Sequence, residues 1–188
     1  MTTRVLHLSA RDRIGGAGRT AYRFHQSLKD SGVNSSLLTQ RRSMDEANIY
    51  GPSGIIGKLY DGFRRKLDQL PVLKYQNRDP ELFSPAWVPS RVISQVNRID
   101  PDLIHLHWVT GGFLTPEVIG DLSSPIVWTL HDMWPFTGGC HYAKNCKRYT
   151  ESCGVCPHLG SESMDDLSKT VHQRKNNAWE NASMYIVT

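Results

Sequence analysis

The sequence predicts an α/β fold, with a parallel sheet that is covered by helices on both faces. Two observations carry this prediction. Short apolar, strand-like runs alternate with segments of helical periodicity along the whole chain, and the resulting β-α order is typical of a parallel sheet. The length of 188 residues corresponds to about one domain, because domains average roughly 150 residues. We therefore expect a single domain over residues 1–188.

The first three elements are a strand, a helix and a second strand. The apolar run 5–8 predicts the strand, and residues 9–17 form a glycine-rich loop after it. A helix over residues 18–30 follows, because apolar side chains recur on one of its faces. Gly32 suits the C-cap of this helix, and the run 33–39 predicts the second strand.

The middle of the chain predicts two helices and little sheet. Residues 40–54 are typical of a loop, and residues 55–70 have the periodicity of an amphipathic helix that Pro71 ends. The proline-rich stretch 74–89 predicts an irregular crossing, and a helix over residues 90–98 follows.

The last part of the chain predicts three more strands. The run 103–108 is a strand, and Thr115-Pro116-Glu117 is a good start for a short helix that ends near Leu122. A fourth strand covers residues 125–130, and a long loop over 131–162 holds every cysteine. The final helix and strand are expected over residues 165–181 and 184–187.

Composition excludes several classes of protein. The hydrophobic share of 39 % and the charged share of 21 % are ordinary for a soluble globular protein. A net charge of +4 is too small for a nucleic-acid-binding footprint but suits phosphate-bearing ligands or an anionic membrane surface. The N-terminal apolar run is too short for a signal peptide, which predicts a cytoplasmic protein.

The glycine-rich turn after the first strand is a candidate phosphate site. Gly15, Gly16 and Gly18 let the backbone approach a ligand, the helix N-terminus favours a phosphate or diphosphate, and Arg19 adds a cation. The pattern differs from the dinucleotide fingerprint, and no acid ends the second strand, so NAD is disfavoured. The P-loop motif is absent as well. A tight turn that binds nothing remains the alternative.

Three histidines lie on or near the central strands. His105 and His107 face the same side of the sheet, whereas His131-Asp132 follows the carboxyl end of the fourth strand, where open α/β sheets bind ligands. His131 can bond sugar hydroxyls or phosphate oxygens, and Asp132 can orient it or act as a base. A packed core role for His105 is one alternative. A metal-dependent hydrolase on His105, His107 and Asp132 is another.

The four cysteines follow the pattern Cys140-x5-Cys146-x6-Cys153-x2-Cys156. Four thiolates can hold a structural zinc ion and close a long loop that has little core of its own, with His141 and His158 as spare ligands. Reduced, packed thiols and a redox pair remain open alternatives.

The helix over residues 55–70 carries basic side chains beside its apolar stripe, namely Lys58, Arg64, Arg65 and Lys66. Two interpretations follow. The stripe packs on the sheet and leaves a solvated polar face, or it contacts an anionic membrane.

Two longer motifs are more specific. Residues 101–108 read PDLIHLHW and residues 128–142 read WTLHDMWPFTGGCHY, and the cysteine run through Pro157 follows them. With the strand–GGAG–helix turn, these residues make nearly the whole chain resemble the N-terminal domain of a family 4 glycosyltransferase. The closest type builds bacterial colanic acid-like polysaccharides. The resemblance implies the Rossmann-like N-terminal half of a GT-B fold.

The resemblance also implies a function. Such an enzyme is of the hexosyltransferase type and moves a sugar from a nucleotide-sugar to a glycan or lipid-linked acceptor. The transfer retains the configuration at the anomeric carbon and uses no catalytic metal. The reaction takes place at the inner face of the cell membrane. Gly15, Gly16 and Gly18 would lie near the donor diphosphate, and His131 would approach the donor sugar. His107 and Trp108 would line the acceptor side.

The donor-binding C-terminal domain of the family is absent from these residues, so the chain alone is expected to be inactive and to need that domain as a partner. A non-enzymatic, zinc-stabilised module that binds a glycan or a protein is the alternative.

Overall fold

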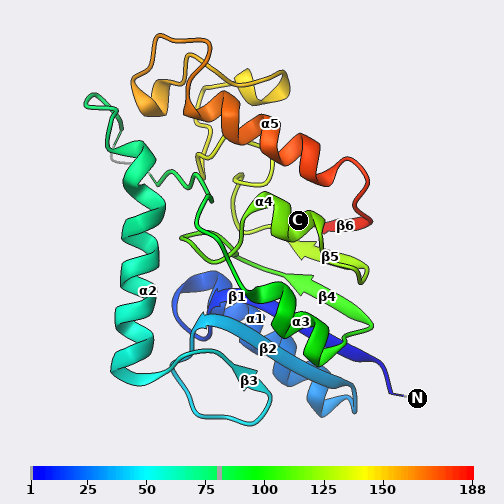
Figure 1. Cartoon of the computed structure of the whole chain (residues 1–188). Coiled ribbons are helices and arrows are strands. Elements are labelled where there is room, and N and C mark those ends of the chain that lie inside the picture. The colour runs from blue at the N-terminus through cyan, green and yellow to red at the C-terminus, as the bar shows by residue number, and fades with distance from the viewer. Residues whose placement is uncertain (1, 80–81) are drawn as a thin grey trace.

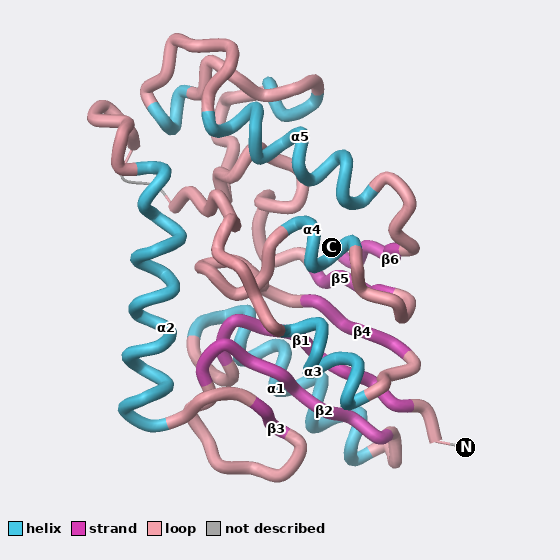
Figure 2. The backbone as a smooth tube through the Cα atoms, viewed as in Figure 1, coloured by secondary structure: helices cyan, strands magenta, loops and turns pink. Residues whose placement is uncertain are grey.

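The computed structural model describes residues 2–79 and 82–188, which form an open parallel sheet flanked by helices (Figures 1 and 2). The strands are β1 (Arg4–Arg11), β2 (Asn34–Arg41), β3 (Ile49–Tyr50), β4 (Leu103–Leu106), β5 (Ile126–Thr129) and β6 (Met184–Val187). The helices are α1 (Gly15–Asp30), α2 (Gly54–Gln69), α3 (Val92–Ile99), α4 (Pro116–Gly120) and α5 (Leu167–Trp179). Three 3₁₀ turns cover Leu70–Val72, Arg148–Thr150 and Pro157–Leu159.

The strand order is β3-β2-β1-β4-β5-β6, and every pairing is parallel. This is the order of the doubly wound, Rossmann-like folds, in which the direction of winding reverses between β1 and β4. The predicted fold class is therefore confirmed.

Some element bounds were predicted wrongly. The loop expected over residues 9–17 is shorter, because β1 stays paired with β2 as far as Arg11 and α1 already begins at Gly15. The two-residue strand β3 lies inside the expected loop 40–54, where it pairs with Leu37 and Leu38. A strand this short has no period that a sequence pattern could reveal.

One face of the sheet carries the main apolar core. Leu6, Leu8, Ile104, Leu106 and Trp128 alternate along β1, β4 and β5 and are almost fully buried. Side chains of α3, α4 and the end of α5 pack on this face, and Figure 1 shows these helices in front of the sheet. Burial of this apolar surface is the main source of stability for the fold.

The opposite face carries histidines at its centre, beside a small apolar cluster of Ala21, Leu37 and Ile49. His7 on β1, His105 on β4 and His107, the first residue after β4, point to this face, and α1 covers it with His25 and Phe24. Their rings pack on one another, and His25 is hydrogen-bonded through Nδ1 to Oγ of Ser35 at 2.8 Å. The sheet is therefore apolar on one side and rich in imidazole on the other.

Helix α2 stands beside the sheet (Figure 1). Its polar side faces inward. Its buried residues are Gly57, Asp61 and Asp68. Asp61 accepts hydrogen bonds from Arg11 at 2.6 Å and from Gln40 at 2.9 Å. The expectation that the apolar stripe packs on the sheet is therefore wrong. The stripe faces away from the body because polar bonds anchor the other side.

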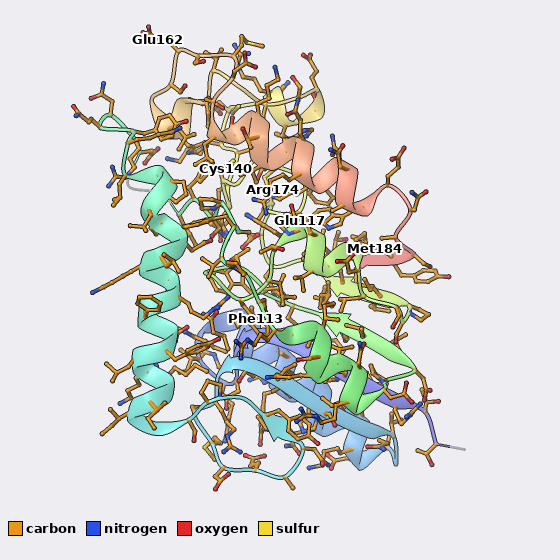
Figure 3. The ribbon with its side chains drawn as sticks, viewed as in Figure 1. Phe113, Glu117, Cys140, Glu162, Arg174 and Met184 are labelled. Carbon is orange, nitrogen blue, oxygen red and sulfur yellow. The ribbon has the colours of Figure 1, made fainter. Side chains whose placement is uncertain are left out.

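The cysteine-rich loop has more support than the sequence suggested. A satellite core packs beneath it, formed by Val72, Phe83, Cys140, Cys156 and Leu159. Helix α5 secures the same region, because Arg174 bonds Glu117 of α4 at 2.7 Å and the buried Lys175 donates to the carbonyl oxygens of Trp134 and Thr137. Figure 3 shows Arg174 and Glu117 beside each other, below Cys140. The expectation of a loop with little core was therefore wrong.

We predict that the chain, kept metal-free with EDTA, loses stability steeply between pH 7 and pH 5. Burial is the main cause that lowers the pKa of His7 to about 3, of His25 and His105 to about 4 and of His107 to about 2. In the unfolded chain a histidine pKa is about 6.5. The contribution of these neutral imidazoles to the free energy of unfolding is therefore complete above pH ~6.5. Below that pH, the free energy of unfolding falls by up to about 1.4 kcal/mol per pH unit for each histidine.

Urea unfolding at a series of pH values measures this slope. The variant His25→Gln removes one of the four imidazoles. Its free energy of unfolding should therefore depend less steeply on pH, by the equivalent of about one proton taken up on unfolding. A free energy of unfolding that stays level from pH 7 to pH 5 would show that these imidazoles are not buried neutral.

Candidate functional site

A cleft of about 480 Å³ lies at the carboxyl edge of the sheet, beyond the ends of β1, β4 and β5. Open α/β sheets bind ligands at this edge, at the point where the strand order reverses. The cleft is lined by Ser9, Arg11, Ile14, Gly15, Gly16, Ala17, Gly18, Thr20, Arg65, Leu82, Trp108, His131, Asp132, His141 and Tyr142. It therefore brings together the glycine turn, Trp108 and the His131-Asp132 pair, which are far apart in the sequence.

The glycine turn supplies backbone donors to this cleft. Gly15 has a φ of +75°, and a Cβ on Gly18 would lie 2.7 Å from the carbonyl oxygen of Arg11, so a side chain at either position would strain the turn. Within the described chain, the N-cap residue Ile14 offers no side-chain hydrogen bond, and the first turn of α1 holds no acid. The N-terminus of α1 thus keeps its partial positive charge for a ligand.

The cations of the cleft are not those that the sequence suggested. Arg19 is exposed and does not line the cleft, and its Nε donates to the carbonyl oxygen of Gly15 at 3.2 Å. Arg11 and Arg65 line the cleft instead, and the guanidinium of Arg65 lies 6.0 Å from the ring centroid of Trp108. Arg11 could have been noticed because it is the last residue of its strand. Arg65 comes from α2, and nothing in the sequence around it indicates that it reaches the cleft.

Asp132 is the hub of a hydrogen-bond network. Its carboxylate accepts from Nε1 of Trp108 at 2.9 Å and from the backbone N–H of Trp134 at 2.9 Å, and Nδ1 of His141 lies 2.6 Å away. Burial alone would raise the pKa of Asp132, but these bonds, led by that of His141, outweigh it and lower the pKa. Asp132 therefore stays ionised and fixes Trp108 and His141 at the cleft wall.

His141 is placed differently from its expected role as a spare zinc ligand. Its Nε2 lies 2.9 Å from Oγ of Ser84, and its Nδ1 faces Asp132. The side chain therefore belongs to the cleft and not to the cysteines.

His131 is half-buried and lines the cleft, and burial lowers its pKa. Its imidazole is therefore neutral near pH 7 and can both donate and accept a hydrogen bond. The Nε2 atom of His131 lies 3.4 Å from Nδ1 of His107. His107 itself is 2 % exposed and lies beneath His131, outside the set of residues that line the cleft.

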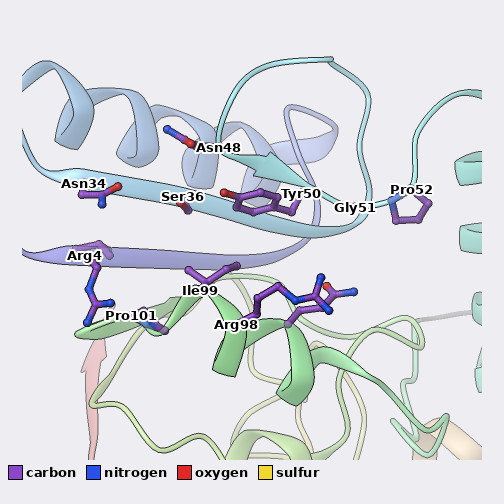
Figure 4. A pocket seen from close by; sticks show the side chains of 12 residues that line it. Arg4, Asn34, Ser36, Asn48, Tyr50, Gly51, Pro52, Arg98, Ile99 and Pro101 are labelled. Carbon is purple, nitrogen blue, oxygen red and sulfur yellow. The ribbon is translucent and has the colours of Figure 1, made fainter.

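A second, larger pocket of about 650 Å³ lies at the amino edge of the sheet (Figure 4). Arg4, Asn34, Tyr50, Arg98 and Pro101 are among its lining residues. No histidine and no carboxylate belongs to this lining, and the pocket is at the edge where parallel α/β sheets do not bind their ligands. We therefore place the functional site in the smaller cleft.

The four cysteines form a separate cluster. Cys140, Cys146, Cys153 and Cys156 line one small cavity, and none forms a disulfide. Burial raises the pKa of the Cys140 thiol. It also raises the pKa of Cys153 to about 12 and that of Cys156 to about 11. The free thiols are therefore neutral.

The donor chemistry fits zinc, because four sulfur atoms converge on one cavity and Zn²⁺ binds thiolates readily. In the described part of the chain, however, the metal-ligand atoms that gather within 4.8 Å of one another are those of His7, His105 and His107. No three of the cysteine sulfurs in the described residues gather that closely.

Comparison with known proteins gives a family match and a relative. Residues 14–153, which include the glycine turn, His131 and Asp132, match the model of Glycosyltransferase Family 4. A protein of Escherichia coli (strain K12), provisionally named as the colanic acid biosynthesis glycosyl transferase WcaC, is 23 % identical over 175 residues. This alignment covers 84 % of the chain and 40 % of the relative, so the chain spans about two fifths of that relative's length. No solved structure matches. Since the family model covers most of the sequence, the chain belongs to glycosyltransferase family 4.

Proposed function

We propose that this chain forms the acceptor-side half of a retaining glycosyltransferase that builds a bacterial polysaccharide. The whole enzyme would move a hexose from a nucleotide-sugar to a glycan or lipid-linked acceptor. The observation that carries the proposal is the cleft itself, which joins the glycine turn of α1 to His131 at the switch point of the sheet. The matched relative's name refers to colanic acid biosynthesis, which agrees with this class of product.

The glycine turn suits the diphosphate of a sugar nucleotide. The N-terminus of α1 offers backbone N–H groups, and Gly18 lets the chain pass close to Arg11. Arg11 and Arg65 stand in the same cleft and can balance negative charge that develops on the leaving diphosphate. Arg19 would reach such a ligand only from the rim.

His131 and Trp108 suit the sugars. A neutral, half-buried His131 can hydrogen-bond a hydroxyl of the donor sugar or a phosphate oxygen, and Asp132 stays ionised close to it. Trp108 is held by Asp132 and offers an aromatic surface to the acceptor, next to Tyr142. His107 would act through His131, which it contacts from below.

The chain supplies only part of this site. It spans about two fifths of the relative's length, and we propose that a donor-binding domain completes the cleft in the whole protein. Transfer depends on holding donor and acceptor together, so the half-site alone should not catalyse it. A zinc ion held by Cys140, Cys146, Cys153 and Cys156 would tie the cysteine-rich loop in place, and it would take no part in the chemistry.

Sugar transfer is the first test. We expect no turnover by residues 1–188 alone, and transfer of a labelled sugar by the full gene product that carries them. In that product, His131→Ala should lower kcat/KM by about 10²–10³-fold, the usual effect of losing a hydrogen-bonding group in the reaction centre. The matched control is His172→Gln, because His172 lies on α5 and bonds the carbonyl oxygen of Tyr149, away from the cleft.

Turnover by the 188 residues alone, or full activity of His131→Ala, would contradict the proposal. Glycan binding by the full product without any transfer would favour the zinc-stabilised binding module instead.

We further propose that α2 brings the enzyme to an anionic membrane that carries its acceptor. Ile55, Ile56, Leu59 and Phe63 are 65–76 % exposed on its outer side. Lys58 and Lys66 are exposed on the same helix. Apolar side chains flanked by cations are typical of helices that lie in a membrane interface. No helix in the described residues has the length and hydrophobicity needed to cross a membrane.

Vesicle sedimentation tests this contact. The chain should bind vesicles that contain phosphatidylglycerol, bind phosphatidylcholine vesicles more weakly, and lose binding as salt rises. Replacing both Ile56 and Phe63 by Ser should reduce binding at least tenfold, because about 2 kcal/mol is lost for each large apolar side chain that leaves the lipid. Tyr185→Ser is the matched control, since Tyr185 is 66 % exposed but lies on β6. Equal binding by both variants would show that α2 is not the contact.

A further inference from the structure

We propose that His7, His105 and His107 form a binding site for a divalent transition-metal ion, with Zn²⁺ as the best candidate. The site lies between the sheet and α1, beneath the cleft and separate from the cysteines. One ligand atom from each of the three side chains lies within 4.8 Å of the others. All three residues are buried.

The parallel register of β1 and β4 builds this cluster. His7 is the direct cross-strand neighbour of His105, and His107 follows two residues later on the same face. The ring centroids of His7 and His105 are 5.0 Å apart, and those of His105 and His107 are 4.2 Å apart. His7 and His105 are held by the paired strands, and the backbone N–H of His107, just after β4, donates to the carbonyl oxygen of Leu8 at 3.0 Å.

The spacing of the nitrogen atoms suits a tetrahedral ion. Nδ1 of His7 and Nε2 of His107 are 3.3 Å apart. Two imidazole nitrogens at about 2.0–2.1 Å from a tetrahedral zinc ion lie about 3.3 Å from each other. The pair thus already has the separation that the ion would impose. Nε2 of His7, the other nitrogen of that ring, is buried and has no hydrogen-bond partner among the described residues.

The surroundings supply the partners that metal-binding histidines use. Nε2 of His105 lies 2.8 Å from Oγ1 of Thr129, and Nδ1 of His107 lies 3.4 Å from Nε2 of His131. Such outer contacts fix the tautomer and orientation of a ligand imidazole. Three nitrogen donors favour Zn²⁺, Co²⁺, Ni²⁺ or Cu²⁺ over Mg²⁺ and Ca²⁺, which prefer oxygen.

Asp132 does not take part in this site. Its carboxylate is bonded to Trp108, Trp134 and His141, so the hydrolase constellation of His105, His107 and Asp132 does not form. The proposed ion would clamp β1 to β4, and through His107 it would hold His131 at the floor of the cleft.

Cobalt titration of the chain with all four cysteines changed to Ser tests the site, because no thiolate remains there. We expect one Co²⁺ per chain, with ligand-field bands of tetrahedral geometry and no sulfur-to-cobalt charge-transfer band. His7→Gln and His105→Gln in this background should each weaken Co²⁺ binding by at least about 100-fold. Losing a residue that only hydrogen-bonds to a metal ligand lowers metal affinity by up to about 100-fold, so losing the ligand itself should cost at least as much. His25→Gln is the matched control, because His25 packs beside His7 but bonds Ser35.

Absence of Co²⁺ uptake in the folded cysteine-free chain, or unchanged uptake in His7→Gln, would overturn the proposal. Imidazole ¹⁵N spectra of the unaltered chain give an independent readout that needs no variant. On addition of Zn²⁺, one ring nitrogen of each of the three histidines should shift as coordinated nitrogen does. Spectra in which these signals do not move would also overturn it.

Discussion

The parallel pairing of β1 with β4 is the constraint on which the rest of the molecule depends. The two strands are a hundred residues apart in sequence, and their pairing sets the point where the winding of the sheet reverses. The glycine turn leaves the end of β1, and Trp108 follows the end of β4, so both reach one cleft. The same register places His7 against His105 beneath that cleft. Ligand site and imidazole cluster are two consequences of a single alignment.

The distribution of polarity around this sheet is unusual and has functional meaning. Aliphatic side chains fill one face, whereas the centre of the other face is occupied by imidazoles. Burial lowers the pKa of these imidazoles and keeps them neutral. Helix α2 reverses the ordinary arrangement, because the ion pair of Asp61 with Arg11 anchors its polar side and leaves its apolar side outward. Both features cost stability in water. We propose an occupant for each, a metal ion for the histidines and a lipid surface for α2.

Much of the fold could be predicted because local patterns determine it. Five of the six strands and all five helices were expected near their observed positions, and Gly15, Trp108, His131 and Asp132 meet in the cleft as the carboxyl-edge rule suggested. What was missed depends on contacts distant in sequence. Periodicity shows that α2 is amphipathic but not which side faces inward, and neither Arg65 nor His7 carries a local signal of its partners. The spacing of the cysteines likewise could not show the satellite core beneath them.

We propose that the carboxyl-edge cleft binds the diphosphate of a sugar nucleotide. ¹H–¹⁵N NMR of the chain can follow this binding during titration with pyrophosphate and with a panel of uridine and guanosine diphosphate sugars. We expect shifts at the amides of Gly15, Gly16 and Gly18 and at His131, with little change around Tyr50 and Arg98 in the amino-edge pocket. Shifts centred on Tyr50 and Arg98, or none at the glycine turn at saturating ligand, would contradict it.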